Sequence, residues 1–524
     1  MRGPIKKFCR VGASFVVLAV TANCLVAQTR EAARERPNPL GFPIIQDPAP
    51  AQEPAPVSMA TNVAVKHADV VVQDAQATEA IVAAYLKKEA ERKRSADEEK
   101  KAEGQAKREY DLYGGTRFSL QSLYDSLSVP REGEKKWYEK LSIKGYTQIR
   151  FGRTLDTQEE TPNLFGDRTI NGNAENFLIR RARVIISGDV SDHLYVYMQP
   201  DFASTPQGST TSTFFGQLRD LYADVYVDTD KVHRFRVGLS KIPYGWENCQ
   251  SSQNRIPLDR TDAMNTAVAP NERDLGVIYY WTPVEYQKLF ATLVRGGMKG
   301  SNNFGVFAFG AYDGQGGSVP EANLNLHMVS RLTLPVQLDN GQIVEGSIQG
   351  YRGDYVVTGS KIRPLGKGAE GVTPKGTGGT KGILEQRIAG TFVWFPQPLG
   401  FQAEWQIGEG PGLNDKQTEV GVRNLHGGYV MTMYRHETSR CGIFTPYLRY
   451  QQYTGGYRNI ANAPYGYQRQ TDIGVEWQIR KELELVVEYS IVNTPNFSAR
   501  DTAGAVSYRD FEGSTLRFQL QFNY

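Results

Sequence analysis

The end of the chain alternates strictly between large apolar and polar side chains, and this pattern limits the possible folds more than any other feature. From Leu516 to Tyr524 the sequence reads LRFQLQFNY, with apolar residues at even positions and polar residues at odd positions. Because successive side chains of a β-strand point to opposite faces, one face must lie in apolar surroundings and the other in water. A soluble protein with a β-sheet core meets this requirement, and so does a barrel whose apolar face contacts lipid.

The lengths of the connections distinguish these two folds. Sixteen segments have the character of strands: 141–152, 177–190, 192–202, 218–228, 232–243, 273–282, 303–313, 322–336, 342–358, 385–395, 399–409, 427–436, 443–452, 468–480, 482–492 and 514–524. Connections after odd-numbered segments are mostly long, and those after even-numbered segments are mostly tight, as at the hairpin signal Asn340-Gly341. This asymmetry is typical of membrane barrels. The sequence therefore predicts an all-β fold, a sixteen-stranded antiparallel transmembrane β-barrel with both of its ends on the short-connection side.

Aromatic residues near the ends of strands favour the same fold. They are Tyr279, Tyr280, Trp281, Trp394, Phe395 and Tyr489. Such residues gather where a membrane barrel crosses the lipid–water interface. An exported soluble adhesin or carbohydrate-binding protein, the soluble alternative, would have no need of these girdles.

One connection on the short side is long, and its sequence predicts a helix. Thr282-Pro283-Val284-Glu285 has the pattern of a capping box with proline at the first helical position. Apolar residues then recur at helical spacing and a glycine pair follows: Tyr286, Leu289, Phe290, Leu293, Gly296 and Gly297. We therefore expect a short helix over 283–295 at the end of the barrel.

The first 136 residues have a different character from the barrel. Residues 1–27 combine basic residues with a short apolar run, which predicts a secretory signal peptide. Cys24 could carry a lipid, although Asn23 replaces the usual small residue before it. Residues 28–136 read as a periplasmic extension, with a proline-rich linker and a charged helix around 77–108. The barrel domain then covers 137–524.

Several segments resemble one known family. Residues 137–148 (WYEKLSIKGYTQ), 179–183 (IRRAR), 218–222 (LRDLY), 236–247 (RVGLSKIPYGWE) and 273–277 (RDLGV), with Arg255 and Arg260 between the last two, are similar to the phosphate-selective porin O/P family. The resemblance covers about 137–524 and implies a trimeric sixteen-stranded porin whose third loop folds into the lumen. The long extension departs from the family. The last strand also resembles those that outer-membrane proteins present to their insertion machinery, which implies recognition through Phe522 and Tyr524.

Alternation predicts which charged residues face the lumen. Where apolar neighbours face lipid, six arginines face inward: Arg150, Arg181, Arg183, Arg234, Arg236 and Arg517. The third loop and the start of the sixth strand add Arg255, Arg260 and Arg273 to a predicted constriction. A guanidinium suits phosphate or carboxylate because its planar fork donates two hydrogen bonds at once. These residues are therefore the candidate sites for binding small anions.

Acidic residues leave the selectivity of this lumen open. Six carboxylates also face inward, and three more lie in the third loop: Asp220, Asp224, Glu404, Glu476, Glu484, Glu488, Glu247, Asp259 and Glu272. Opposed acidic and basic walls are typical of a general diffusion pore, whereas a phosphate site needs several cations without nearby carboxylates. Both a phosphate-preferring and a general porin fit the sequence.

The other residues with chemical potential do not form a known site. The six histidines are scattered, and none lies beside a nucleophile or in a metal-binding spacing, so we predict no enzyme, metal or cofactor. The net charge of +3 gives no argument for nucleic acid. Cys249 and Cys441 fall at opposite ends of the predicted barrel, which predicts no disulfide.

The sequence predicts an outer-membrane porin for passive diffusion of small hydrophilic solutes, embedded in outer-membrane lipid. The alternative is a surface or adhesion protein that uses the barrel as an anchor.

Overall fold

A computed structural model describes the barrel domain of this chain. The described residues are 136–155, 170–171, 174–175, 177–203, 216–268, 273–317, 319–362, 371–496 and 509–524. The predicted signal peptide over 1–27 and all of the extension over 28–136 except Lys136 lie outside these residues. No helix among them is long and apolar enough to span a membrane.

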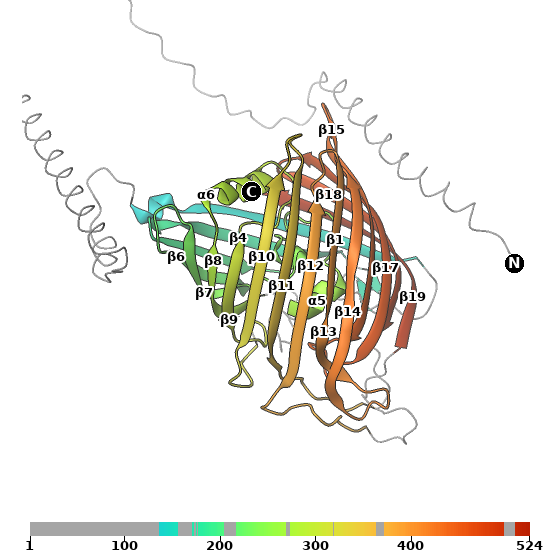
Figure 1. Ribbon diagram of the computed structural model, residues 1–524. Coiled ribbons are helices and arrows are strands. Elements are labelled where there is room, and N and C mark those ends of the chain that lie inside the picture. Colours follow the sequence, from blue (N-terminus) through green and yellow to red (C-terminus); the bar gives the residue numbers. More distant parts are fainter. Residues whose placement is uncertain are drawn as a thin grey trace, which may run out of the picture. The chain divides into compact units, whose positions relative to one another are not determined.

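The described residues form one closed antiparallel barrel (Figure 1). Its strands are β1 (Ser142–Thr154), β4 (Phe177–Ser191), β5 (Leu194–Asp201), β6 (Gln217–Tyr226), β7 (His233–Lys241), β8 (Arg273–Trp281), β9 (Phe307–Tyr312), β10 (His327–Gln337), β11 (Ile343–Tyr355), β12 (Ile383–Trp394), β13 (Leu399–Leu413), β14 (Val420–Tyr434), β15 (His436–Thr438), β16 (Gly442–Gly456), β17 (Tyr465–Arg480), β18 (Leu483–Asn496) and β19 (Arg509–Asn523). Both β14 and β15 pair with β16, so β15 continues β14 after a break at Arg435. The prediction of sixteen strands around the barrel is confirmed.

The last strand closes the ring against the first. Each strand pairs with the next along the chain, and β19 pairs with β1, with Phe151 opposite Phe518. The backbone of Tyr524 exchanges two hydrogen bonds with Gly145, which continues this pairing to the last residue. The alternating segment from Leu516 to Tyr524 therefore forms the seam of the barrel. Closure satisfies the backbone groups that an open edge would expose to lipid.

The connections are long at one end of the barrel and short at the other. The short-connection end is the upper one in Figure 1, where the label for the C-terminus lies beside the helix α6 (Val284–Arg295). The predicted helix over 283–295 is thus present, but it begins one residue later than expected. Pro283 is its N-cap, and the Thr282 hydroxyl contacts the Asn303 side chain instead of capping the helix. In outer-membrane barrels the short connections face the periplasm.

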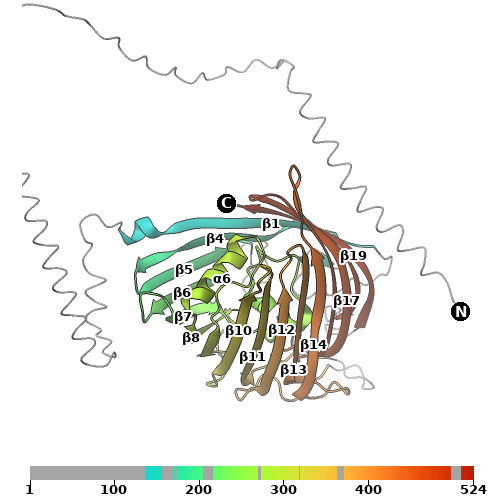
Figure 2. The same ribbon diagram turned by 45° about the horizontal axis from the view of Figure 1, so that its top comes forward.

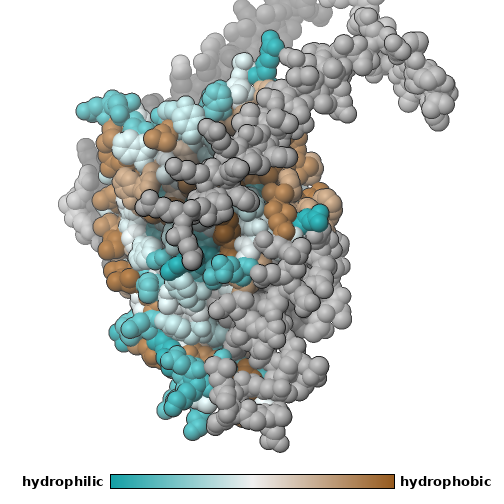
Figure 3. Space-filling view, turned by 90° about the vertical axis from the view of Figure 1, so that its right-hand side faces the viewer, coloured by the Kyte–Doolittle hydropathy of each residue, from teal (hydrophilic) through white to brown (hydrophobic). Residues whose placement is uncertain are grey.

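The two faces of the strands have opposite character, as the alternation predicts. On β10, for example, Met328, Leu332 and Leu334 are exposed on the outside while Val329 and Arg331 are buried inside. In Figure 3 brown apolar residues lie along the left and right flanks, and teal residues gather at the lower, long-loop end. An apolar outer belt of this kind is the surface that lipid requires.

Two details of the sequence prediction were wrong. The strand expected over 303–313 begins only at Phe307, because the residues before it enter the barrel interior. Tyr280 and Phe395, expected among the aromatic residues of the membrane interface, are buried on the inside, whereas Trp281 and Trp394 are exposed. Alternation explains this difference, since neighbouring residues of one strand cannot share a face.

Five short elements complete the description of these residues. They are the 3₁₀ turn η1 (Trp137–Lys140), the two-residue strands β2 (Ile170–Asn171) and β3 (Ala174–Glu175), which pair with each other, and two helices between β7 and β8, α4 (Trp246–Cys249) and α5 (Asp262–Val268). The connection that carries α4 and α5 is the third long connection, and it determines the shape of the lumen.

Candidate functional site: the lumen and its third loop

The third loop, residues 242–272, folds into the barrel. Its described part ends at Val268, and nearly all of the residues from Ile242 to that point are buried or half-buried. The turn into α4 requires Gly245, whose φ of +80° lies in the left-handed region. Lys241, at the end of β7, donates hydrogen bonds to the carbonyl oxygens of Asn248 (2.9 Å) and Gln250 (2.6 Å), which satisfies the C-terminal end of α4.

Apolar contacts hold the loop against one side of the wall. Met264 is fully buried and belongs to a cluster with Tyr351, Tyr429, Met431 and Met433, on the inner faces of β11 and β14. The interior of a porin is normally polar. Here a small hydrophobic core inside the barrel fixes the loop to that wall, through the same burial of apolar area that stabilises soluble proteins.

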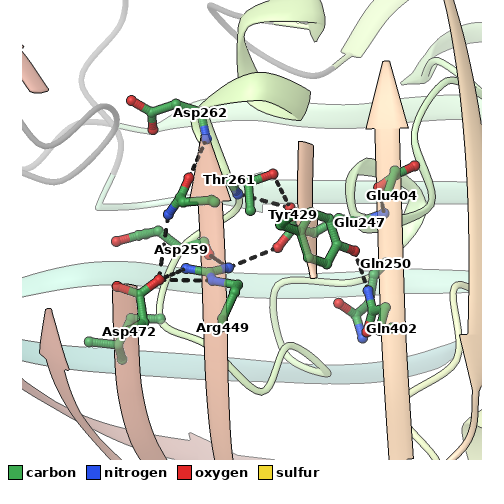
Figure 4. A network of polar contacts seen from close by, with 12 residues as sticks. Glu247, Gln250, Asp259, Thr261, Asp262, Gln402, Glu404, Tyr429, Arg449 and Asp472 are labelled. Atoms are coloured by element: carbon green, nitrogen blue, oxygen red, sulfur yellow. Dashed lines mark hydrogen bonds and ion pairs between the residues drawn. The ribbon is translucent and has the colours of Figure 1, made fainter. Parts of the chain in front are cut away.

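A network of charges anchors the loop to the same side (Figure 4). Arg449 of β16 binds Glu247 of the loop at 3.1 Å and Asp472 of β17 at 2.8 Å. Glu247 also accepts hydrogen bonds from the backbone and the hydroxyl of Thr261, at 2.8 and 2.9 Å. The Glu404 carboxylate accepts the Trp246 backbone N–H at the start of α4, at 2.6 Å. These bonds join both helices of the loop to the wall.

Asp259 ties the loop to the seam of the barrel. Its carboxylate lies 2.7 Å from Arg150 of β1 and 2.9 Å from Arg517 of β19, and Arg150 also donates to the carbonyl oxygen of Leu258 at 2.9 Å. Burial alone would raise the pKa of Asp259, but the two guanidiniums hold this pKa well below its usual value. The structure therefore uses Arg150 and Arg517, two predicted anion-binding residues, to position the loop.

Several other predicted arginines are paired with carboxylates on neighbouring strands. Arg236 makes two hydrogen bonds to Asp224, at 2.7 and 2.8 Å. Arg234 lies 3.8 Å from the same carboxylate. Arg273 binds Asp220 at 3.0 Å. Because Asp224 and Asp220 offset part of their positive charge, these three residues add less to the field in the lumen than the sequence suggested.

Three guanidiniums converge where the loop meets β1 and β4. Arg183 and Arg255 both donate to the Ser252 hydroxyl, at 3.4 and 3.2 Å. Arg181 donates to the Gln148 side chain at 2.6 Å, and Gln148 in turn donates to the Ser252 carbonyl oxygen at 3.1 Å. We call Arg181, Arg183 and Arg255 the basic cluster. Its members come from β4 and the third loop, so only the folded lumen brings it together.

The basic cluster has fewer negative partners than cations. Arg183 binds Asp201 at 2.7 Å. Within the described part of the chain, neither Arg181 nor Arg255 forms an ion pair with a carboxylate. Burial lowers the pKa of Arg255, while Glu247 and Asp259 act in the opposite direction. Two further cations lie close by, because Arg255 of the cluster and Arg219 are both electrostatic neighbours of Arg260. This part of the lumen therefore carries an excess of positive charge.

Among the residues that the structure describes, four arginines that are buried in the lumen are missing from the sequence analysis: Arg331, Arg387, Arg449 and Arg458. The alternation rule would have found three of them. Leu448 and Tyr450 face outward around Arg449, for example, in the same way as the residues around Arg181. Arg387 and Arg458 both bind Glu385, so this single carboxylate offsets part of the charge of the two guanidiniums.

The predicted acidic residues face inward, and most have partners. Glu488 binds Arg517, Glu404 caps α4, and Glu476 and Glu484 share Lys299. Glu272 lies outside the described residues. Within the described ranges no group of acidic, histidine or cysteine side chains could hold a metal. Cys249 in α4 and Cys441 between β15 and β16 do not form a disulfide with each other.

Comparisons with known proteins found one family model and several similar solved structures. The family model described as phosphate-selective porin O and P matches residues 154–524. Similar solved structures include OmpF of Salmonella typhi in complex with daunomycin (12% identity, 75% of this chain and 99% of that one, TM-score 0.43). Others are the channel DcaP of Acinetobacter baumannii (12%, 73% and 97%, 0.42) and an anion-selective porin from Comamonas acidovorans (10%, 73% and 99%, 0.40). No curated protein matches the sequence. The chain belongs to the phosphate-selective porin O and P family and is a passive outer-membrane channel.

Proposed function

We propose that this channel passes small hydrophilic solutes, prefers anions, and has no catalytic activity. The basic cluster is the site at which an anion, and a phosphate group in particular, is recognised. The observation that carries this proposal is the meeting of Arg181, Arg183 and Arg255, of which the first and last form no ion pair with a carboxylate among the described residues.

The arrangement of the basic cluster favours binding of phosphate over binding of chloride. Guanidiniums held close together repel one another, and an anion between them would relieve that repulsion. A phosphate group can accept two hydrogen bonds from each planar fork, which chloride cannot match in geometry. Asp201 and Asp220 lie on the same wall and bind Arg183 and Arg273. We therefore expect a preference for anions that still allows other small solutes to pass.

Conductance of the purified protein in planar bilayers tests this proposal. We expect a reversal potential in asymmetric potassium chloride that indicates anion preference, and a current that added phosphate blocks. Arg181→Gln and Arg255→Gln should weaken the block and reduce the anion preference. Arg352→Gln is the matched control, since Arg352 is exposed on the outer face of β11 and its loss removes the same charge.

The other outcomes of that experiment would each overturn part of the proposal. A large, weakly selective current that phosphate does not affect would identify a general diffusion porin. A correctly folded barrel without any current would favour the alternative of a surface or adhesion protein anchored by the barrel.

We also propose a homotrimer with residues 28–136 in the periplasm, exported by the segment 1–27. The resemblance of 137–524 to a trimeric porin family and the composition of the first residues support this arrangement. Phe522 and Tyr524 are proposed as the residues that the insertion machinery recognises. The mass of the detergent-solubilised oligomer, with and without residues 28–130, tests both the trimer and any role of the extension in assembly. A monomer in both cases would reject the trimer.

A further inference from the structure

The connection between α6 and β9 enters the barrel from its short-connection end. In Figure 2 α6 lies across this end, within the ring of strands. Leu293 of α6 is almost completely buried in a cluster with Trp246 of the third loop and Phe395 of the wall. We call residues 296–306, which follow α6, the crossbar. Ser301 and Val306 of the crossbar are 2% exposed, so this segment lies inside the lumen rather than beside the opening.

The crossbar contacts opposite walls of the lumen. On one side the Lys299 ammonium lies 2.5 Å from Glu476 of β17 and 2.9 Å from Glu484 of β18. On the other side the Asn303 carbonyl oxygen accepts a hydrogen bond from Arg234 of β7. In the order of pairing around the ring, β7 and β17 lie nearly half the circumference apart. The segment between Lys299 and Asn303 therefore crosses the lumen.

The crossbar also touches the third loop. The Gln250 side chain donates a hydrogen bond to the Lys299 carbonyl oxygen at 2.5 Å. The third loop and the crossbar are thus joined at this contact inside the lumen.

Lys299 has an unfavourable backbone conformation that its ion pairs offset. Its φ of +59° lies in the left-handed region, which is unfavourable for a residue with a Cβ atom. Burial would lower the pKa of Lys299, but Glu476 and Glu484 raise it above its usual value, so the ammonium stays charged at neutral pH. A glycine would adopt this φ without cost, but it would leave both carboxylates unpaired.

We propose that the crossbar is a second filter of the pore and that Lys299 is its specificity-determining residue. Lys299 acts in two ways. Its ion pairs fix the crossbar across the lumen, which limits the size of solutes. Its charge neutralises one of two carboxylates at the periplasmic exit, which permits anions to leave. The inference rests on the channel function of the barrel but not on phosphate recognition at the basic cluster.

Two sets of substitutions with opposite charge changes separate these effects. Lys299→Gln removes one positive charge, and the double variant Glu476→Gln with Glu484→Gln removes two negative charges, yet both break the same bridge. Lys299→Arg keeps the bridge. Arg295→Gln, at the exposed end of α6, is the control for loss of one charge at this end. Heat-modifiable gel mobility shows which variants are folded.

Single-channel conductance and the cut-off for neutral polyethylene glycols are measured for each folded variant. We expect both bridge-breaking sets to raise the conductance on the order of twofold and to admit larger polymers, because the narrowest section limits a pore. Their selectivities should shift in opposite directions, towards cations for Lys299→Gln and towards anions for the double variant. Lys299→Arg and Arg295→Gln should keep the wild-type cut-off, and phosphate block should survive in Lys299→Gln.

Other results would overturn the inference. Opposite selectivity shifts with an unchanged cut-off in both sets would mean that the crossbar is no barrier. No change in either property would place it outside the ion path. A failure of phosphate block in the wild type would affect only the proposed function, since the polymer cut-off does not depend on anion binding. If Lys299→Gln does not fold, the single variants of Glu476 and Glu484 provide the same test.

Discussion

Asp259→Asn removes the carboxylate that holds the third loop to the seam of the barrel. In the wild type this group lies 2.7 Å from Arg150 and 2.9 Å from Arg517, and its side chain is 14% exposed. Removing one partner of a buried ion pair costs about 3 to 5 kcal/mol. Arg150 keeps its bonds to Gln519 and Leu258, and Arg517 keeps Glu488, so we place the cost at about 2 to 3 kcal/mol.

This cost predicts a measurable change in the current through single channels. A free-energy change of about 1.4 kcal/mol alters a population tenfold. The fraction of time that the third loop spends displaced from the seam therefore rises on the order of a hundredfold. We therefore expect Asp259→Asn to show frequent steps to a higher conductance and a noisier open state than the wild type. Asp339→Asn, in the exposed hairpin between β10 and β11, is the matched control. If the recordings of Asp259→Asn match those of the wild type, the apolar contacts alone hold the loop and our reasoning is wrong.

Three further predictions concern folding and pH. Gly427 has a φ of +154°, and an added Cβ would lie 2.3 Å from the Gln452 carbonyl oxygen. Gly427→Ala should therefore lower the folded fraction on heat-modifiable gels. The control Gly390→Ala should not lower it, because its Cβ would meet nothing within 4 Å. Leu448→Arg, on the outer face of β16, should reduce the free energy of unfolding in liposomes by about 2 to 4 kcal/mol, and an unchanged urea midpoint would contradict a lipid-facing position. Because the pKa of Asp259 is lowered in the folded barrel, its stabilising pairs are present above its unfolded pKa of about 3.9 and are lost as the pH falls through the lower folded value. Protonation of Asp259 should therefore change the conductance only below about pH 4. If Asp259→Asn shows a similar acid transition, the transition belongs to another residue.

Local pattern was enough to predict the strands and the faces of their residues. Alternation depends only on the backbone of the strand itself, so the inward position of Arg181, Arg183 and Arg236 followed from their neighbours. The helix over 283–295 was predictable for the same reason, since its apolar spacing lies within one segment. The predicted start of this helix was one residue too early. The sequence pattern treats Thr282 as the N-cap, whereas Pro283 is the N-cap in the structure.

The partners of the lumen charges could not be predicted in this way. Arg150 and Arg181 have the same local pattern, yet Arg150 binds Asp259 and Arg181 forms no ion pair with a carboxylate among the described residues. The difference comes from the path of the third loop, which is separated from β1 by more than a hundred residues along the chain. The crossbar was missed for a similar reason, because the residues around Lys299 have no periodic pattern that places them inside the barrel.

The sequence by itself determined the barrel, the number of its strands, its long and short ends and which face of each strand turns its charged residues inward. These properties arise from the period of two along each strand and from the lengths of the turns. Only the tertiary structure decided which of those charges are neutralised and which remain available to a solute. Ion pairs across a lumen depend on distances between residues on different strands, and closure of the ring and insertion of the loop set those distances.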